Sequence, residues 1–252
     1  MTDADVSGPG GSPPGPLRAA AEALFGDRLA LASSYASLLA TDGVVRGLIG
    51  PREAPRIWDR HLLNCAAMAE LIPSGASVVD VGSGAGLPGI VLAVARPDLS
   101  VVLVEPLARR IAFLAEVVPA LGLDRSVTVV RGRAEELGET LTPADVVTAR
   151  AVAPLDRLVG WCLPLAALGG RLLALKGASA ADEVAEHRDA IGRLGGSTPV
   201  VRLCGVDVID PPTTVVEIIR ERAVAPARPR SARGAGRSKR RSTSDGGRAR
   251  RG

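Results

Sequence analysis

Aromatic side chains are scarce in this sequence, at 2% of its 252 residues. A protein surface that binds single-stranded RNA by stacking its bases needs several aromatic rings. The composition therefore predicts that any contact with RNA is electrostatic and local.

Residues that bind metals or form disulfides are also few. The three cysteines, Cys65, Cys162 and Cys204, lie far apart in apolar surroundings, and there are only two histidines. This spacing matches neither a disulfide framework nor a zinc site. We predict that the cysteines are buried free thiols and that the protein binds no metal.

Long apolar runs are missing as well. No run approaches the roughly 20 residues needed to cross a bilayer. The N-terminal residues also lack the basic segment and apolar core of a secretory signal. We therefore expect a cytoplasmic protein that does not contact membranes, and we expect it to be a monomer.

Charge is distributed unevenly along the chain. Residues 223–252 carry nine arginines and Lys239 but only one acid, Asp245, which gives this tail a net charge of +9. Because the whole chain has a net charge of +4, the remaining residues carry −5. The tail either attracts phosphate groups of RNA or is a solubilising extension.

The most informative stretch is 78–94. It begins with a β-branched run, continues through Gly82, Gly84 and Gly86, and becomes apolar over a helical length after Pro88. Glycines at this spacing permit positive φ angles and the close approach of a ligand, so the pattern predicts a strand, a ligand-binding turn and a helix. The segment also fits the G-x-G-x-x-G pattern of dinucleotide folds, which alone is a weak signal.

Two acidic residues help to choose the ligand. Asp80 lies two residues before the first glycine, where a carboxylate repels the pyrophosphate of a dinucleotide but attracts the ammonium and sulfonium groups of S-adenosylmethionine. Glu105 ends the next apolar run, where an acid accepts hydrogen bonds from ribose hydroxyls of either ligand. S-adenosylmethionine is therefore favoured, and a glycine turn with two solvated acids is the alternative.

The patterning divides the chain into four parts: a disordered segment at 1–16, a helical cap at 17–72, an α/β domain at 73–222 and a basic disordered tail at 223–252. Within the α/β domain, the sequence predicts strands at 76–81, 100–105, 126–131, 144–148, 170–175, 199–206 and 213–220. It predicts helices at 87–95, 107–121, 134–138, 154–165 and 180–194. Only residues 207–212 separate the last two strands, so we expect an antiparallel pair at the sheet edge.

Ligands of open α/β sheets bind at the carboxyl ends of the strands. The candidate site therefore consists of the segments 80–86, 131–135, 148–152 and 176–177, together with Glu105. The segment 148–154 lacks the Asn/Asp-Pro-Pro-aromatic clamp of an exocyclic amine methylase, and Cys162 lies inside a predicted helix rather than at a site. The remaining reaction is transfer to an atom that is already nucleophilic, such as a purine ring nitrogen, which needs placement rather than a general base.

Three basic residues have two interpretations each. Arg150 is placed to orient a base through its O6 oxygen or to hold a phosphate, or else it pairs with Glu135 or Asp145. His61 contacts RNA or is a satisfied helix histidine. Lys176 binds phosphate or is a solvated lysine at a strand end.

Several segments together resemble one known family. They are DVGSGAGLPGI at 80–90, RHLLN at 60–64, RRIAFL at 109–114, RAEE at 133–136, ARA at 149–151 and ALKG at 174–177. This combination resembles the RsmG family, also called glucose-inhibited division protein B, over residues 31–222. The Leu-Pro-Gly completion of the glycine loop and the arginine after the fourth strand are more specific than the glycines alone.

The resemblance implies a Rossmann-like class I methyltransferase with a seven-stranded, mostly parallel sheet. It implies methyl transfer from S-adenosylmethionine to N7 of one guanine in 16S ribosomal RNA of the small subunit. It also implies a set of cofactor contacts: Asp80, Gly82, Gly84, Gly86, Leu87, Glu105, Ala134, Glu135 and Arg150. Arg150 is then the candidate catalytic residue, and His61 and Lys176 are the candidate RNA contacts.

The sequence departs from the family in two ways. Ala151 and Val152 stand where family members commonly have an aromatic residue, and the tail lies beyond the shared core. Two further classes of function stay open, namely a small-molecule methyltransferase and a non-catalytic ribosome-assembly or RNA-binding module. A nicotinamide dehydrogenase is disfavoured by Asp80.

Overall fold

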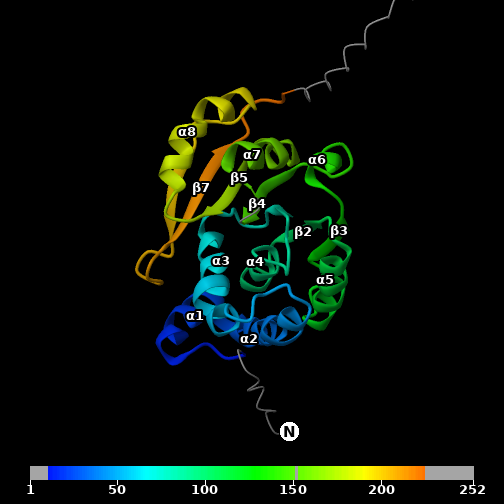
Figure 1. The fold of residues 1–252 in the computed structure, drawn as a ribbon, viewed down its shortest axis with the longest axis vertical. Coiled ribbons are helices and arrows are strands. Elements are labelled where there is room, and N and C mark those ends of the chain that lie inside the picture. The colour runs from blue at the N-terminus through cyan, green and yellow to red at the C-terminus, as the bar shows by residue number, and fades with distance from the viewer. Residues whose placement is uncertain (1–10, 151–152, 225–252) are drawn as a thin grey trace, which may run out of the picture.

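A computed structural model describes residues 11–150 and 153–224 of the chain. Its centre is one seven-stranded sheet with the order β3-β2-β1-β4-β5-β7-β6 (Figure 1). The strands are β1 (Ser77–Val81), β2 (Ser100–Glu105), β3 (Val127–Arg131), β4 (Ala144–Arg150), β5 (Ala166–Lys176), β6 (Val200–Cys204) and β7 (Thr213–Ile219). All seven strands lie at the positions expected from the apolar runs.

The sheet is mostly parallel. Strands β1 to β5 pair in parallel, whereas β7 pairs antiparallel with both β5 and β6. The prediction of an antiparallel pair at the sheet edge is confirmed. The strand order reverses at β1, which has β2 on one side and β4 on the other, so the crevice expected for a ligand lies at the carboxyl end of β1.

The helices also follow the predicted pattern. They are α1 (Arg18–Phe25), α2 (Leu29–Leu38), α3 (Leu63–Ala67), α4 (Gly89–Ala95), α5 (Ala108–Ala120), α6 (Ala134–Leu137), α7 (Leu155–Cys162) and α8 (Ala180–Arg193). The helix expected at 154–165 is α7 followed by a 3₁₀ turn, Leu163–Leu165. Pro164, which has no N–H to donate, lies in that turn and explains why the α-helix does not continue.

Two apolar clusters cover the two faces of the sheet. On one face, the N-terminal cap, α4 and α5 pack against alternate strand residues such as Val78, Leu103 and Val146. On the other face, α6, α7 and α8 pack against the intervening residues such as Val79 and Val147. We call these the cap face and the far face. The period of two along each strand therefore decides which helices a side chain meets.

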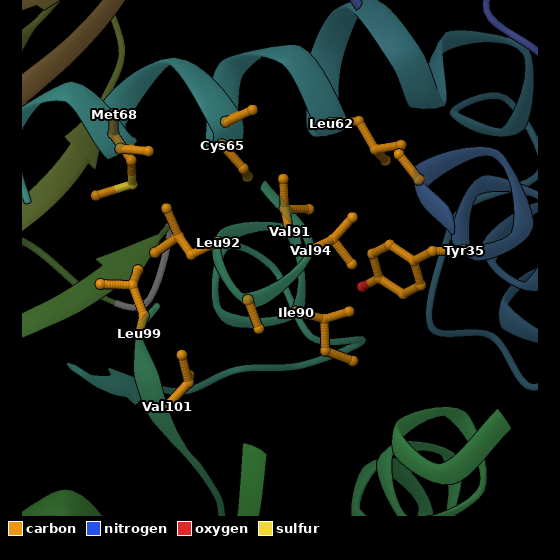
Figure 2. Close-up of a cluster of buried hydrophobic side chains, with 14 of the residues drawn as sticks. Tyr35, Leu62, Cys65, Met68, Ile90, Val91, Leu92, Val94, Leu99 and Val101 are labelled. Carbon is orange, nitrogen blue, oxygen red and sulfur yellow. The ribbon is translucent and has the colours of Figure 1, made fainter. Parts of the chain in front are cut away.

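Helix α4 lies in the middle of the cap face. Figure 2 shows side chains of the cap on one side of α4 and side chains of β2 on its other side. The labelled residues are Tyr35, Leu62, Cys65 and Met68 of the cap, Ile90, Val91, Leu92 and Val94 of α4, and Leu99 and Val101 beside and on β2. Each large side chain buried here contributes about 1.5–3 kcal/mol, so the cap is an integral part of the core.

The N-terminal segment differs in part from the expectation of disorder. Gly11 and Pro13 are buried, and a 3₁₀ turn at Gly15–Leu17 is closed by a hydrogen bond from the Leu17 N–H to the Pro14 carbonyl (2.8 Å). Proline has little backbone freedom to lose on ordering, which favours such a turn. Residues 1–10 and 225–252, on which the other predictions of disorder fall, lie outside the described residues.

No helix within residues 11–150 and 153–224 has both the length and the apolar character needed to cross a bilayer. The cysteine prediction is confirmed, because Cys65, Cys162 and Cys204 are all buried free thiols.

Candidate active site at the carboxyl ends of the strands

The glycine-rich turn after β1 has the backbone geometry that its sequence predicts. Gly82, Gly84 and Gly86 have φ angles of 69°, 59° and 101°, a region that L side chains disfavour. A Cβ atom at Gly86 would lie 2.5 Å from Ile90 Cδ1, whereas one at Gly84 would have only the Gly82 carbonyl oxygen within 4 Å. The turn is thus packed against α4 at Gly86 and open at Gly84.

Asp80 is fully buried beneath this turn. Its Oδ2 accepts a hydrogen bond from the Gly89 N–H (3.0 Å), which is the first N–H of α4, and its Oδ1 accepts one from the Thr148 hydroxyl (3.0 Å). Burial raises the pKa of Asp80 to about 6, against the opposing effect of these hydrogen bonds. Asp80 therefore ties together β1, β4 and the start of α4, in addition to placing an acid under the turn.

Glu105, at the end of β2, has an equally buried carboxylate. It accepts hydrogen bonds from the Gly84 N–H (3.0 Å) and the Leu107 N–H (3.0 Å), and Arg110 lies 3.3 Å from it. The neighbouring β3 loop is close, because the Gly132 N–H donates to the Glu105 carbonyl (3.2 Å). Glu105 thus joins the turn after β1 to the turns after β2 and β3.

Arg150, at the end of β4, contacts the cap rather than an acid. Its Nη1 lies 3.4 Å from Cys65 Sγ, and its Nη2 donates to the Arg60 carbonyl (3.4 Å) and to His61 Nδ1. Neither Glu135 nor Asp145 is its partner, since Asp145 instead accepts from the Ser77 N–H and hydroxyl. The ion-pair interpretation of Arg150 is therefore wrong.

A pocket of about 610 Å³ opens beside Arg150. Its wall is formed by the cap, by the end of β5 and by the β6–β7 connection, including Arg60, Asn64, Lys176, Pro211 and Thr213. Asn64 is fixed there, since its Oδ1 accepts from the Thr213 hydroxyl (2.9 Å). The pocket has both polar and apolar walls and lies at the same edge of the sheet as the glycine turn.

The structure gives the two expected RNA contacts partners within the chain. Lys176 forms an ion pair with Glu183 (2.7 Å) and donates to the Ala153 carbonyl (3.1 Å), and its side chain is only 11% exposed. His61 is 8% exposed and accepts from Arg150. Lys176 still lines the pocket, whereas His61 lies behind it.

The other predicted site residues surround the turn. Leu87 is half-buried against the cap-face cluster, Ala134 begins α6 with its side chain buried, and Glu135 is exposed in the first turn of that helix. The Leu87 N–H donates to the Ser83 carbonyl in the glycine turn (2.9 Å), whereas no hydrogen bond among the described residues joins Ala134 or Glu135 to that turn.

Sequence reasoning missed Tyr35, which contacts the site's framework, and it included Thr148 in the candidate segment 148–152 without predicting its partner. Tyr35 of α2 is buried and donates a hydrogen bond to the Ala85 carbonyl in the glycine turn (2.7 Å). Thr148 of β4 is buried and donates to Asp80. The one available signal for Tyr35 is that it is the only tyrosine in the sequence and lies in an apolar helix.

The sequence profile described as rRNA small subunit methyltransferase G matches residues 28–206, which include the glycine turn, Glu105, Arg150 and the cap residues that contact Arg150. The chain belongs to this family. A ribosomal RNA small subunit methyltransferase G of Salinispora tropica is 71% identical over 228 residues, covering 88% of this chain and 94% of that protein. The corresponding protein of Corynebacterium efficiens is 55% identical over 205 residues, covering 81% and 88%.

Solved structures share the fold of this family member at low sequence identity. The structure of PigF with SAH has a TM-score of 0.51 and 16% identity, covering 81% of this chain and 62% of that one. An O-methyltransferase (NcsB1) from neocarzinostatin biosynthesis, solved in complex with S-adenosylmethionine, has a TM-score of 0.50 and 18% identity, covering 79% and 60%. These similarities show a Rossmann-like methyltransferase fold, as the sequence predicts.

Proposed function

We propose that this chain transfers the methyl group of S-adenosylmethionine to N7 of a guanine in 16S ribosomal RNA of the small ribosomal subunit. The observation that carries the proposal is the match of a small-subunit rRNA methyltransferase family to a chain whose glycine turn, two buried acids and Arg150 meet at one edge of the sheet.

The glycine turn fits S-adenosylmethionine better than a dinucleotide. Asp80 is fully buried beside the turn, where its negative charge disfavours a pyrophosphate, whereas Glu105 suits the ribose of either ligand. The open side of Gly84 leaves room for a ligand to approach the backbone. We assign the contacts to Asp80, Gly82, Gly84, Gly86, Leu87, Glu105, Ala134, Glu135 and Arg150.

Glu105 would hold the ribose. Its carboxylate accepts from the N–H groups of Gly84 and Leu107, and a carboxylate has further lone pairs for the ribose hydroxyls. Movement of Gly84, which a Cβ does not constrain, would expose those lone pairs. When bound, S-adenosylmethionine supplies an electrophilic methyl group on a positively charged sulfur.

We assign the acceptor to a ring nitrogen because the site residues can position an acceptor atom but do not provide nucleophilic catalysis. Guanine N7 carries a free lone pair, so the protein has only to align it. Cys162 does not serve as a nucleophile, since it is fully buried in α7 on the far face and burial raises the pKa of its thiol. Arg150 is placed to bind the guanine O6 atom alone, which leaves the lone pair of N7 free for the methyl group.

The pocket beside Arg150 would admit the base. Both Arg60 and Lys176 line it and each pairs with an acid, Glu53 (3.3 Å) and Glu183 (2.7 Å), but the Arg60 side chain is 52% exposed and that of Lys176 only 11%. We therefore assign the phosphate contact to Arg60 rather than to Lys176 or the buried His61. The basic tail adds a second attraction to RNA in this proposal. Deleting residues 223–252 is then expected to weaken RNA binding most at low salt and to leave cofactor affinity unchanged.

The test is transfer of labelled methyl from S-adenosylmethionine to small-subunit particles, and to their deproteinised RNA, from cells that lack this protein. Mapping should find the label as a single N7-methylguanine in 16S RNA. Label on another atom would overturn the assignment of N7. Cofactor binding without transfer to either substrate would instead favour a small-molecule acceptor or a non-catalytic role in ribosome assembly.

A further inference from the structure

Arg150 is held by neutral groups. Its guanidinium contacts the Cys65 thiol, the Arg60 carbonyl and the His61 ring. It forms no ion pair with a described carboxylate, although its charge acts to lower the pKa of the buried Asp80. A guanidinium held in this way is oriented but not neutralised. Its charge remains available to an electron-rich group in the adjoining pocket.

The three contacts come from one stretch of the cap. His61 and Cys65 are four residues apart where the π-helical turn Ile57–Leu62 continues into α3, so their side chains lie on one face of the helix. They meet Arg150 across 89 and 85 residues of sequence. The cap therefore reaches directly to the end of β4.

His61 is suited to accept a hydrogen bond from a cation. It is 8% exposed, and burial together with the positive charge of Arg150 lowers its pKa to about 4. A neutral imidazole has one acceptor nitrogen, and Nδ1 takes that role here, which leaves the proton on Nε2. Nε2 lies 3.4 Å from Glu53 Oε2 without the geometry of a hydrogen bond, so this acid orients the ring only weakly.

We propose that His61 is a positioning residue for methyl transfer: its Nδ1, supported by the Cys65 thiol and the Arg60 carbonyl, fixes the Arg150 guanidinium where the acceptor guanine enters. The inference rests on the function proposed above, and it gives the buried His61 a role other than contact with RNA. In this proposal the cap positions a residue of the active site, in addition to covering the hydrophobic core.

The effect of His61 is expected on the acceptor side of the reaction. Without its acceptor nitrogen, the guanidinium can leave its position at the pocket. This affects one of the assigned cofactor contacts, that of Arg150, while the eight others, including Asp80 and Glu105 at the glycine turn, remain. A hydrogen bond to a charged group is worth about 10- to 100-fold in an equilibrium. We expect a loss of this size in kcat/KM for the small subunit and little change in the affinity for S-adenosylmethionine.

The first experiment compares three variants. His61→Leu removes the acceptor, His61→Gln places one near the position of Nε2, and His61→Asn places one near the position of Nδ1. We expect His61→Leu and His61→Gln to lose about 10- to 100-fold in kcat/KM, with cofactor affinity within about twofold of wild type, and His61→Asn to recover most of the loss. Wild-type kcat/KM in His61→Leu, or equal losses in His61→Asn and His61→Leu, would overturn the proposal.

A second experiment needs no catalysis. Nitrogen-15 NMR of the wild-type imidazole should show His61 with the proton on Nε2, and its Nδ1 resonance should move in the Arg150→Met variant. A proton on Nδ1, or an unmoved resonance, would contradict the contact whether or not a variant is active. If the wild type transfers no methyl but the resonance moves, the proposed function fails while the contact between His61 and Arg150 stands.

Discussion

The two faces of the sheet bury different kinds of side chain. The far face is packed almost wholly with aliphatic residues from α6, α7 and α8. The cap face and the glycine turn contain the buried polar residues of the described chain: His61, Asp80, Ser83, Glu105, Thr148, Thr213 and Glu217. Burying a polar group costs free energy unless the group is hydrogen-bonded or paired with a charge. Because the buried polar residues lie on one face only, we infer that this face serves function as well as stability.

The strand alternation explains how this division arises. Asp80 lies between Val79 and Val81, which face α6 to α8, and Thr148 lies between Val147 and Ala149, which do the same. Both of these polar residues therefore have apolar neighbours in sequence that pack their strands against the far face. The apolar packing of the far face holds the strands in place, and the polar residues of the site lie on the cap face.

The largest expected effect comes from a matched pair of leucines, one on each face. Leu158→Ala in α7 and Leu92→Ala in α4 both empty a fully buried position and should each lower the free energy of unfolding by about 2–5 kcal/mol. Only Leu92→Ala should also weaken S-adenosylmethionine binding, because α4 supports the glycine turn. Denaturant unfolding measures the loss of stability, and calorimetric titration measures the affinity for S-adenosylmethionine. An equal loss of this affinity in both variants would show that the two faces do not differ in their support of the site.

The second prediction concerns pH and the cap. The pKa of His61 is lowered from 6.5 to about 4 in the folded protein, so the unfolded chain binds a proton first as the pH falls. The stability of the wild type should therefore decrease between pH 6.5 and pH 4 relative to His61→Asn, by at most about 2–3 kcal/mol.

The raised pKa of Asp80 acts in the opposite direction, since the folded state then binds the proton more tightly between about pH 6 and pH 4. This contribution is present in both proteins and cancels in the comparison. Parallel stability curves for the wild type and His61→Asn would show that His61 is not held neutral.

The third prediction separates the charge of Asp80 from its packing. Asp80→Asn keeps the shape but removes the charge, whereas Asp80→Ala also leaves the Gly89 N–H and the Thr148 hydroxyl without their partner. We expect Asp80→Asn to lose about 1.5–3 kcal/mol of cofactor binding and Asp80→Ala to lose more, together with thermal stability. Unchanged binding by both variants would refute the assignment of the glycine turn.

The smallest effect is expected at Tyr35. Tyr35→Phe keeps the ring in the core but leaves the buried Ala85 carbonyl without its hydrogen bond, at a cost of about 1 kcal/mol. Affinity for S-adenosylmethionine should fall several-fold while kcat changes little. A change in kcat with unaltered affinity for S-adenosylmethionine would contradict this prediction. It would mean that the cap affects only how the RNA acceptor is positioned.

Local patterns were sufficient to predict the framework. The seven strands, the edge hairpin and the positive φ angles at Gly82, Gly84 and Gly86 depend on residues close in sequence, and the structure has all of them. The family resemblance, based on short motifs, is likewise confirmed.

The partners of the site residues were not predictable in this way. Asp80 bonds to Thr148, Arg150 to His61, and Tyr35 to Ala85, across 68, 89 and 50 residues. A single sequence specifies that Arg150 ends a strand, but which side chain meets it depends on how the cap packs against α4. The ion pair between Lys176 and Glu183 escaped prediction for a similar reason, since a turn lies between the strand and the helix.

The most direct test of the central claim is an amide NMR titration of the whole chain with S-adenosylmethionine. If the site lies on the cap face at the carboxyl ends of β1, β2 and β4, the resonances of Gly82, Gly84, Leu107 and Arg150 should shift, and those of α7 and α8 should not. Shifts confined to α7 and α8, or none at saturating cofactor, would contradict the account.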